Sequence, residues 1–257
     1  MPASEPLTLA SWVAGARLIL PPDAAPVALT ALQLAGLDLG PVLPLQFATA
    51  SQLRSERPEL VLHRFTPTAR SLVDEWAAHG QSTSLLDAVT VADRLMHLRL
   101  VSPASVAELR DHPRSAVRQA ALLARPGAES VRETRMRLCL TLAGLPEPER
   151  QVEIYDANGF VGRFDMAYPE WKILIEYEGD QHRTDPDQWS RDIVRHERAR
   201  ALGYVVIRIT ADLFRDPWSQ VLRVEKALAV AGYSGKAASR SALWAATFMP
   251  VKVQRRR

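Results

Sequence analysis

Apolar and polar side chains alternate with a period of two between residues 163 and 178, the pattern of half-buried β-strands. Residues 169–171, Pro-Glu-Trp, interrupt the alternation and predict a turn. The two halves therefore predict an antiparallel hairpin with two distinct faces. One face carries Phe164, Met166, Tyr168, Ile173, Ile175 and Tyr177, and the other carries Arg163, Asp165, Ala167, Leu174, Glu176 and Glu178.

The register of this hairpin sets which side chains face each other. If it closes symmetrically, Ala167 lies opposite Leu174 and Asp165 lies opposite Glu176. Directly opposed residues have Cβ atoms only about 4.5–5.5 Å apart. The hairpin thus predicts two carboxylates close enough to share an ion, with the apolar face packed in the core behind them. Such a pair is costly unless a cation joins it.

The remainder of the second half supplies the elements around this hairpin. Ser130 followed by Glu133 has the spacing of a capping box and predicts a helix that ends at Gly144. Asn158-Gly159 predicts a hairpin turn between strands at 151–155 and 160–168. The predicted order is helix, three-strand antiparallel meander, helix, strand, helix. The last three elements are expected at 187–202, 204–210 and 217–231.

The first half is rich in Ala, Leu and Pro and predicts a mainly helical α+β domain. Pro44 interrupts a strand-like segment at 42–47, which favours an edge position because proline cannot donate to a β-ladder. A second strand is expected at 60–65. Helices are expected at 27–35, 71–78, 84–98, from 103 onward, and at 114–123.

The segment Arg125–Ala128 has the composition of a linker. We therefore expect an N-terminal domain over residues 1–126, a second domain over 127–235 and a basic C-terminal tail over 236–257. The tail includes Lys252 and three terminal arginines, which are either a solvated end or a weak phosphate contact.

Composition sets the outer limits on class. The chain has 257 residues, of which 47% are hydrophobic and 24% are charged, as in ordinary globular proteins. Its net charge of +3 is only a mild indication of an anionic partner. The single Cys139 excludes an internal disulfide. No apolar run approaches the roughly 18 residues of a membrane span, so we expect a cytoplasmic protein with no membrane partner.

An ordered set of residues in the second half resembles a known family. The residues come in the order Asp165, Glu176-Tyr177-Glu178-Gly179 and His182. A helix with Asp192 and Arg195 follows, and after it the strand Tyr204–Arg208. This order resembles the restriction-endonuclease-like nucleases with the D…(D/E)xK pattern, and within them the branch of the very short patch repair endonucleases. The resemblance covers about a third of the chain. The N-terminal region resembles the winged-helix-like front half of abortive-infection antitoxin relatives that carry a nuclease-like tail.

The resemblance implies metal-dependent hydrolysis of DNA. Asp165 and Glu176 would hold Mg²⁺, or Mn²⁺ in its place, since magnesium is usually bound by one or two carboxylates together with water and phosphate oxygens. Glu133 stands where such folds often place a further acidic ligand on the helix before the sheet, although its role as a cap needs no metal. Glu178 and His182 complete the expected catalytic set.

This chain departs from the family pattern at Glu178, where the common motif has lysine. His182 is the best substitute, because an imidazole titrates near neutral pH and can move a proton. An ordinary structural explanation also exists for each residue. Glu178 can pair across the hairpin with Arg163, and Glu176 can pair with a nearby arginine or lysine.

Arg183, Arg195 and Arg208 are the candidate nucleic-acid contacts, although Arg195 and Arg208 are also suited to holding Asp192 or Glu176. The arginines of the N-terminal region are interleaved with acids, which is typical of a solvated surface. Two functions remain open. The first is a metal-dependent DNA endonuclease. The second is a non-catalytic nuclease-fold DNA-binding or antitoxin-like protein whose N-terminal domain docks a protein partner.

Overall fold

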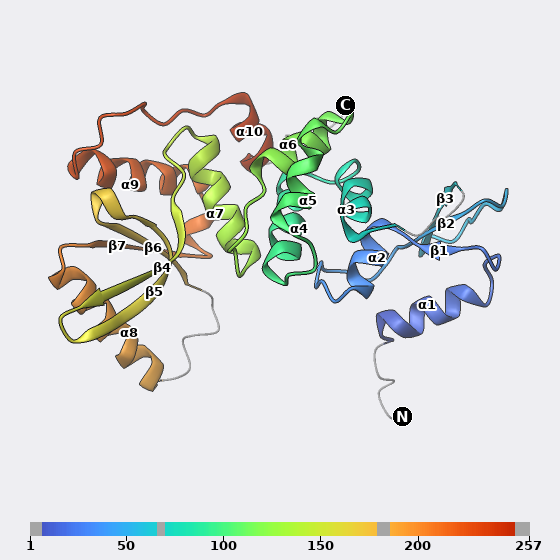
Figure 1. Ribbon diagram of the computed structural model, residues 1–257, viewed down its shortest axis with the longest axis horizontal. Coiled ribbons are helices and arrows are strands. Elements are labelled where there is room, and N and C mark those ends of the chain that lie inside the picture. The colour runs from blue at the N-terminus through green and yellow to red at the C-terminus, as the bar shows by residue number, and fades with distance from the viewer. Residues whose placement is uncertain (1–6, 66–69, 179–185, 250–257) are drawn as a thin grey trace, which may run out of the picture. The chain divides into compact units, whose positions relative to one another are not determined.

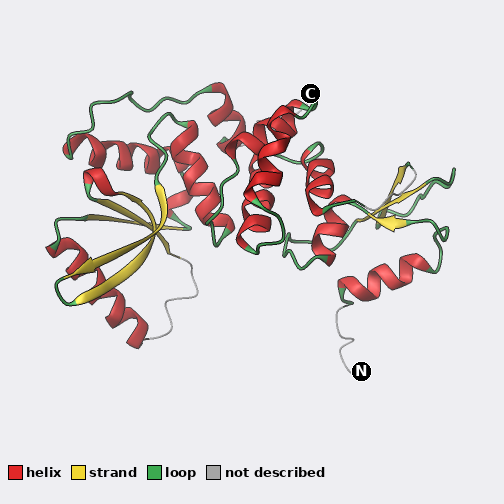
Figure 2. Cartoon of the chain, in the orientation of Figure 1, coloured by secondary structure: helices red, strands yellow, loops and turns green. Residues whose placement is uncertain are grey.

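The computed structural model describes residues 7–65, 70–178 and 186–249, and it divides the chain into two compact units, residues 1–126 and 127–257. The described part is a mixed α/β protein with ten α-helices and two mixed sheets, one of three strands and one of four (Figure 2). No helix within these ranges combines the length and the apolar character needed to cross a membrane.

The first unit contains the three-stranded sheet. Its order is β1-β2-β3, with β1 antiparallel and β3 parallel to the central strand. The strands are β1 (Ala25–Pro26), β2 (Leu45–Thr49) and β3 (Leu60–Arg64). The helices are α1 (Leu9–Arg17), α2 (Ala28–Leu34), α3 (Leu72–Gly80), α4 (Leu85–His97), α5 (Pro103–Ala107) and α6 (Ser115–Leu123).

The expected edge position of the strand near Pro44 is wrong, because β2 is the central strand of this sheet. The strand begins at Leu45, directly after the proline, so the missing N–H lies outside the ladder. The Leu45 N–H donates to the Glu59 carbonyl at 2.8 Å. A strand that begins directly after a proline can therefore occupy the central position of a sheet.

The second unit contains the four-stranded sheet in the order β4-β5-β6-β7. Neighbouring strands are antiparallel for the first two pairs and parallel for β6 and β7. Helix α8 covers one face, and α7 and α9 cover the other (Figure 1). The elements are α7 (Val131–Leu142), β4 (Glu149–Asp156), β5 (Gly159–Tyr168), β6 (Ile173–Glu178), α8 (Pro186–Ala201), β7 (Val205–Thr210) and α9 (Pro217–Val230).

The central hairpin has the predicted register, since Ala167 pairs with Leu174. The strict alternation of its faces is wrong. Phe164 belongs to the same buried cluster as Ala167 and Leu174, together with Ala199 of α8. Phe164 and Ala167 are an odd number of residues apart, so the period of two is interrupted between them, near Asp165.

The expected basic tail also needs correction. Helix α10 (Ala242–Phe248) lies within residues 236–257, and its Trp244 is only 2% exposed. The Trp244 indole N–H donates to the Cys139 carbonyl of α7 at 2.9 Å, and its ring packs edge-on against Trp218. Burial of this indole makes the segment part of the second unit. Lys252 and the three terminal arginines lie outside the described residues.

Candidate functional site

The site lies where strands β5 and β6 separate. The recorded pairs of this ladder end at Met166 and Ile175, one position before Asp165 would face Glu176. Here the Asp165 side chain enters the space between the strands, and its Oδ2 accepts the N–H of Tyr177 at 2.8 Å. A carboxylate thus takes the backbone donor that the β-ladder would otherwise satisfy. This hydrogen bond holds the Asp165 side chain at the point where β5 and β6 separate, the β5–β6 fork.

The surroundings of Asp165 oppose its ionisation. Burial is the largest cause that raises its pKa, which reaches about 6. The charges of Glu133 and Glu176 raise the pKa further, while the Tyr177 N–H and Arg195 lower it. Glu133 of α7 and Glu176 of β6 are therefore each close enough to Asp165 to oppose its ionisation.

The surroundings of Glu133 bear on the two roles considered from the sequence, helix cap and metal ligand. The Ser130 hydroxyl, at the N-cap of α7, accepts the N–H of Glu133 at 3.2 Å. The Glu133 carboxylate accepts the N–H of Glu129 at 3.0 Å and, from the sheet, the Gln151 amide at 2.8 Å. Ser130 therefore caps the helix, whereas the Glu133 carboxylate bonds to Glu129 and Gln151 and lies close enough to Asp165 to raise its pKa.

Glu176 is buried and held by two residues of α8. Its Oε1 lies 2.6 Å from Nη1 of Arg195, and its Oε2 lies 2.5 Å from Nε2 of His196. The exposed fractions of Glu176 and His196 are 8% and 4%. A structural ion pair at Glu176 is therefore present, and Arg195 forms it. His196 was missed in the sequence, because nothing local distinguishes a polar residue on the inner face of a helix from one on its outer face.

Arg195 contacts several groups around Glu176. Besides Glu176 it contacts Asp192 Oδ1 at 3.0 Å and donates to the Arg163 carbonyl at 3.1 Å. Its guanidinium lies over the Phe164 ring, 4.9 Å from the centroid. The expected neighbourhood of Arg195, Asp192 and Glu176 is thus observed.

Gly162 of β5 leaves the space through which the Arg195 side chain passes. A Cβ on Gly162 would lie 2.8 Å from Cγ of Arg195 and closer still to Cδ. Side chains do not approach that closely without displacement, so only glycine leaves room for Arg195 at this point. The alternating pattern alone did not indicate this requirement, although an isolated glycine inside a strand often marks a close approach.

The expected pair of Glu178 with Arg163 is wrong. Glu178 pairs with Arg208 of β7, and Arg163 pairs with Glu129 at 2.9 Å. The β5–β6 ladder has already ended at this level, while β6 stays paired with β7 as far as Glu178. Its carboxylate therefore meets a cation on the parallel neighbour. His182 and Arg183 lie outside the described residues.

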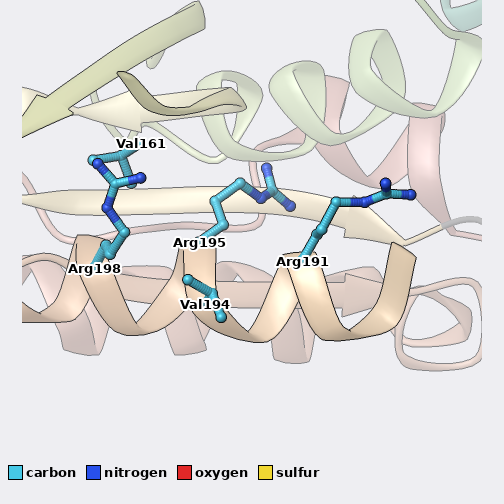
Figure 3. Close-up of a pocket in the computed structure, with 5 residues that line it drawn as sticks. All are labelled: Val161, Arg191, Val194, Arg195 and Arg198. Atoms are coloured by element: carbon cyan, nitrogen blue, oxygen red, sulfur yellow. The ribbon is translucent and has the colours of Figure 1, made fainter. Parts of the chain in front are cut away.

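An open pocket of about 370 Å³ lies beside the acidic cluster, between α8 and β5 (Figure 3). Val161, Arg191, Val194, Arg195 and Arg198 line it. Arg198 forms a two-point ion pair with Asp156, with distances of 2.7 and 2.8 Å, and also donates to the Gly159 and Phe160 carbonyls. This pair lowers the pKa of Asp156.

The donor chemistry of this region fits a hard cation, because Asp165, Glu133 and Glu176 offer carboxylate oxygens. Across residues 7–65, 70–178 and 186–249, however, no three His, Cys, Asp or Glu side chains surround one point in a ready-made metal cage. An ion here would need water or phosphate oxygens to complete its shell.

Comparisons with known proteins identify relatives for only part of the chain. Uncharacterized protein MT2308 and Uncharacterized protein Rv2248, from two strains of Mycobacterium tuberculosis, are each 32% identical over 109 residues. No family model and no solved structure matches. The match spans 42% of this chain and 40% of each relative's length, so the chain is similar to these proteins over less than half of either.

Proposed function

We propose that the second unit is a restriction-endonuclease-like domain, related to the very short patch repair endonucleases, that hydrolyses phosphodiester bonds in DNA with Mg²⁺. The observation that carries this proposal is Asp165 at the β5–β6 fork, with its pKa raised to about 6 by burial and by Glu133 and Glu176. A buried carboxyl group whose pKa is strongly shifted is typical of functional sites.

The arrangement of elements agrees with this proposal. The unit has the order α7, antiparallel strands β4 to β6, α8, parallel strand β7 and α9, which is the order that the family resemblance implies. Asp165 of β5 and Glu176 of β6 lie where these two strands separate. Fold alone does not determine function, and these residues are the chemical support for the proposal.

Asp165 and Glu176, with Glu133 as a further ligand, would hold Mg²⁺, and Mn²⁺ would serve in its place. When bound, the ion would polarise the phosphate and activate a water molecule. Asp165 is already fixed by the Tyr177 N–H. Glu176 is held by Arg195 and His196, so it can join an ion only by sharing an oxygen with them or releasing one.

A second candidate function is a non-catalytic nuclease-fold protein of antitoxin-like type, with a protein partner bound by the first unit. It is favoured by the neutralisation of both glutamates of the expected motif. Glu176 pairs with Arg195 and His196, and Glu178, at the position of the family's lysine, pairs with Arg208. In this alternative the same residues stabilise the sheet edge and bind no ion.

Incubation with supercoiled plasmid separates the two functions. The nuclease proposal expects nicked or linear product with Mg²⁺ or Mn²⁺ and none with chelator. Nicked, mismatched and single-stranded DNA, and RNA, should be tested in parallel, because the substrate structure is open. A protein that binds DNA but cleaves none of these substrates with either metal would contradict the nuclease proposal and favour the second candidate.

His182→Ala should slow metal-dependent cleavage by roughly 10²–10⁴-fold, because a positioned general acid or base contributes about that much. Binding of Mn²⁺, followed by electron paramagnetic resonance, should be retained. His97→Ala, a partly exposed histidine in the first unit, is the matched control and should cleave like the wild type. Equal rates for both variants would remove His182 from the catalytic set.

A further inference from the structure

Helix α8 presents a row of arginines. Arg191, Arg195 and Arg198 are four and three residues apart, the spacing that places side chains on one face of an α-helix. Figure 3 shows all three rising from α8 on the side where Val161 of β5 lies. With Val161 and Val194 they line the open pocket of about 370 Å³.

The three arginines differ in the charges that they meet. Arg195 is paired with Glu176 and Asp192, and Arg198 is paired with Asp156. Arg191 is exposed, and the described side chains offer it no ion pair. Its guanidinium lines the open pocket, where a ligand that enters can reach the charge.

The surrounding helix adds to this charge. Residues 191–200 contain four arginines and two acids, Asp192 and Glu197. The row from Arg191 to Arg198 spans roughly 10 Å at 1.5 Å per residue. One nucleic-acid strand advances about 3.4 Å per nucleotide, so the row matches about three successive nucleotides. Two valines give the pocket apolar walls between its cationic groups.

We propose that this pocket binds the phosphate backbone of the DNA strand presented to the acidic cluster, with Arg191 as the principal phosphate contact. Arg195 is shared by the pocket and by Glu176, so a strand bound along α8 would lie next to the carboxylates. The inference rests on DNA as the ligand of the proposed function. The sequence indicated Arg195 and Arg208 as nucleic-acid contacts, but both are paired with acids. In this inference Arg191 is the main phosphate contact instead.

The test measures duplex-DNA binding without divalent metal, by fluorescence anisotropy of labelled DNA over a series of salt concentrations in chelator. A phosphate contact contributes about 0.9 to the slope of log Kobs against log salt. Arg191→Gln should therefore reduce the magnitude of the slope by about one and weaken binding at low salt, whereas Arg191→Lys should retain most of the slope.

Arg200→Gln is the matched control, because Arg200 is an exposed arginine of α8 that does not line the pocket. It should leave the slope nearly unchanged. Equal slopes for Arg191→Gln and Arg200→Gln, or a wild-type protein that does not bind DNA, would overturn the inference.

The binding assay contains no metal, so its outcome is separate from catalysis. Arg191-dependent binding by a protein that never cleaves would support the pocket and reject the nuclease proposal. Cleavage by a protein whose DNA binding does not depend on Arg191 would support the nuclease proposal and reject the pocket.

Discussion

Asp165→Asn should reduce Mg²⁺-dependent DNA cleavage by orders of magnitude while DNA binding survives or tightens slightly. Asparagine has nearly the same shape, and its amide oxygen can still accept the Tyr177 N–H. It removes the anionic ligand at the centre of the acidic cluster, so hard-cation binding should weaken sharply. Removing a negative charge beside a phosphate also lessens repulsion. Plasmid nicking and metal-free anisotropy measure the two effects separately.

The same substitution should stabilise the metal-free protein at pH 7. The folded-state pKa of Asp165 is about 6, above the ordinary aspartate value of 3.8. Ionisation of this group therefore opposes folding, and the penalty is absent below the unfolded pKa and complete above pH 6. Wild-type stability should fall across this window as pH rises, by on the order of 2–3 kcal/mol from this residue. Denaturant unfolding of Asp165→Asn should show a smaller fall.

Asp212→Asn is the matched control, because Asp212 is an exposed aspartate in the same unit. Cleavage and stability should both stay near wild type. Full activity in Asp165→Asn would exclude Asp165 as a ligand. An unchanged pH profile of stability would show that Asp165 ionises as freely in the folded protein as in the unfolded chain.

Gly162→Ala should destabilise the second unit and slow cleavage together. The new Cβ would collide with the middle of the Arg195 side chain, whose guanidinium is fixed by Glu176, Asp192 and the Arg163 carbonyl. Overpacking of this kind costs about 1–3 kcal/mol. If Arg195 moves aside, Glu176 loses one of its two partners inside the protein. Denaturant unfolding and plasmid nicking measure the result.

A double-mutant cycle identifies the cause. In the Arg195→Ala background the collision is gone, so adding Gly162→Ala should cost little beyond the loss caused by Arg195→Ala itself. Gly15→Ala is the control for a generic glycine effect, because Gly15 lies in α1 with no atom within 4 Å of a Cβ. It should be neutral or stabilising. Additive losses for Gly162→Ala and Arg195→Ala would mean that the two residues do not interact as described.

Local patterns in the sequence predicted most of the helices and strands, but not α1, β1 or α10. The period of two on both sides of residues 169–171 predicted the register of Ala167 with Leu174, because a slip of one residue would exchange the faces. Ser130 followed by Glu133 predicted the start of α7, since the cap is a contact between near neighbours. Asp165 and Glu176 were likewise selected as site residues from their positions on the hairpin.

Only the tertiary structure decided which groups meet across elements. The fork at Asp165 interrupts the alternation, and Glu178 meets Arg208 because β6 pairs with β7 beyond the point where its ladder with β5 ends. The contact of His196 with Glu176, and the space that Gly162 leaves for Arg195, depend on how α8 packs on the sheet. Such contacts join residues far apart in the chain, so no local periodicity carries them.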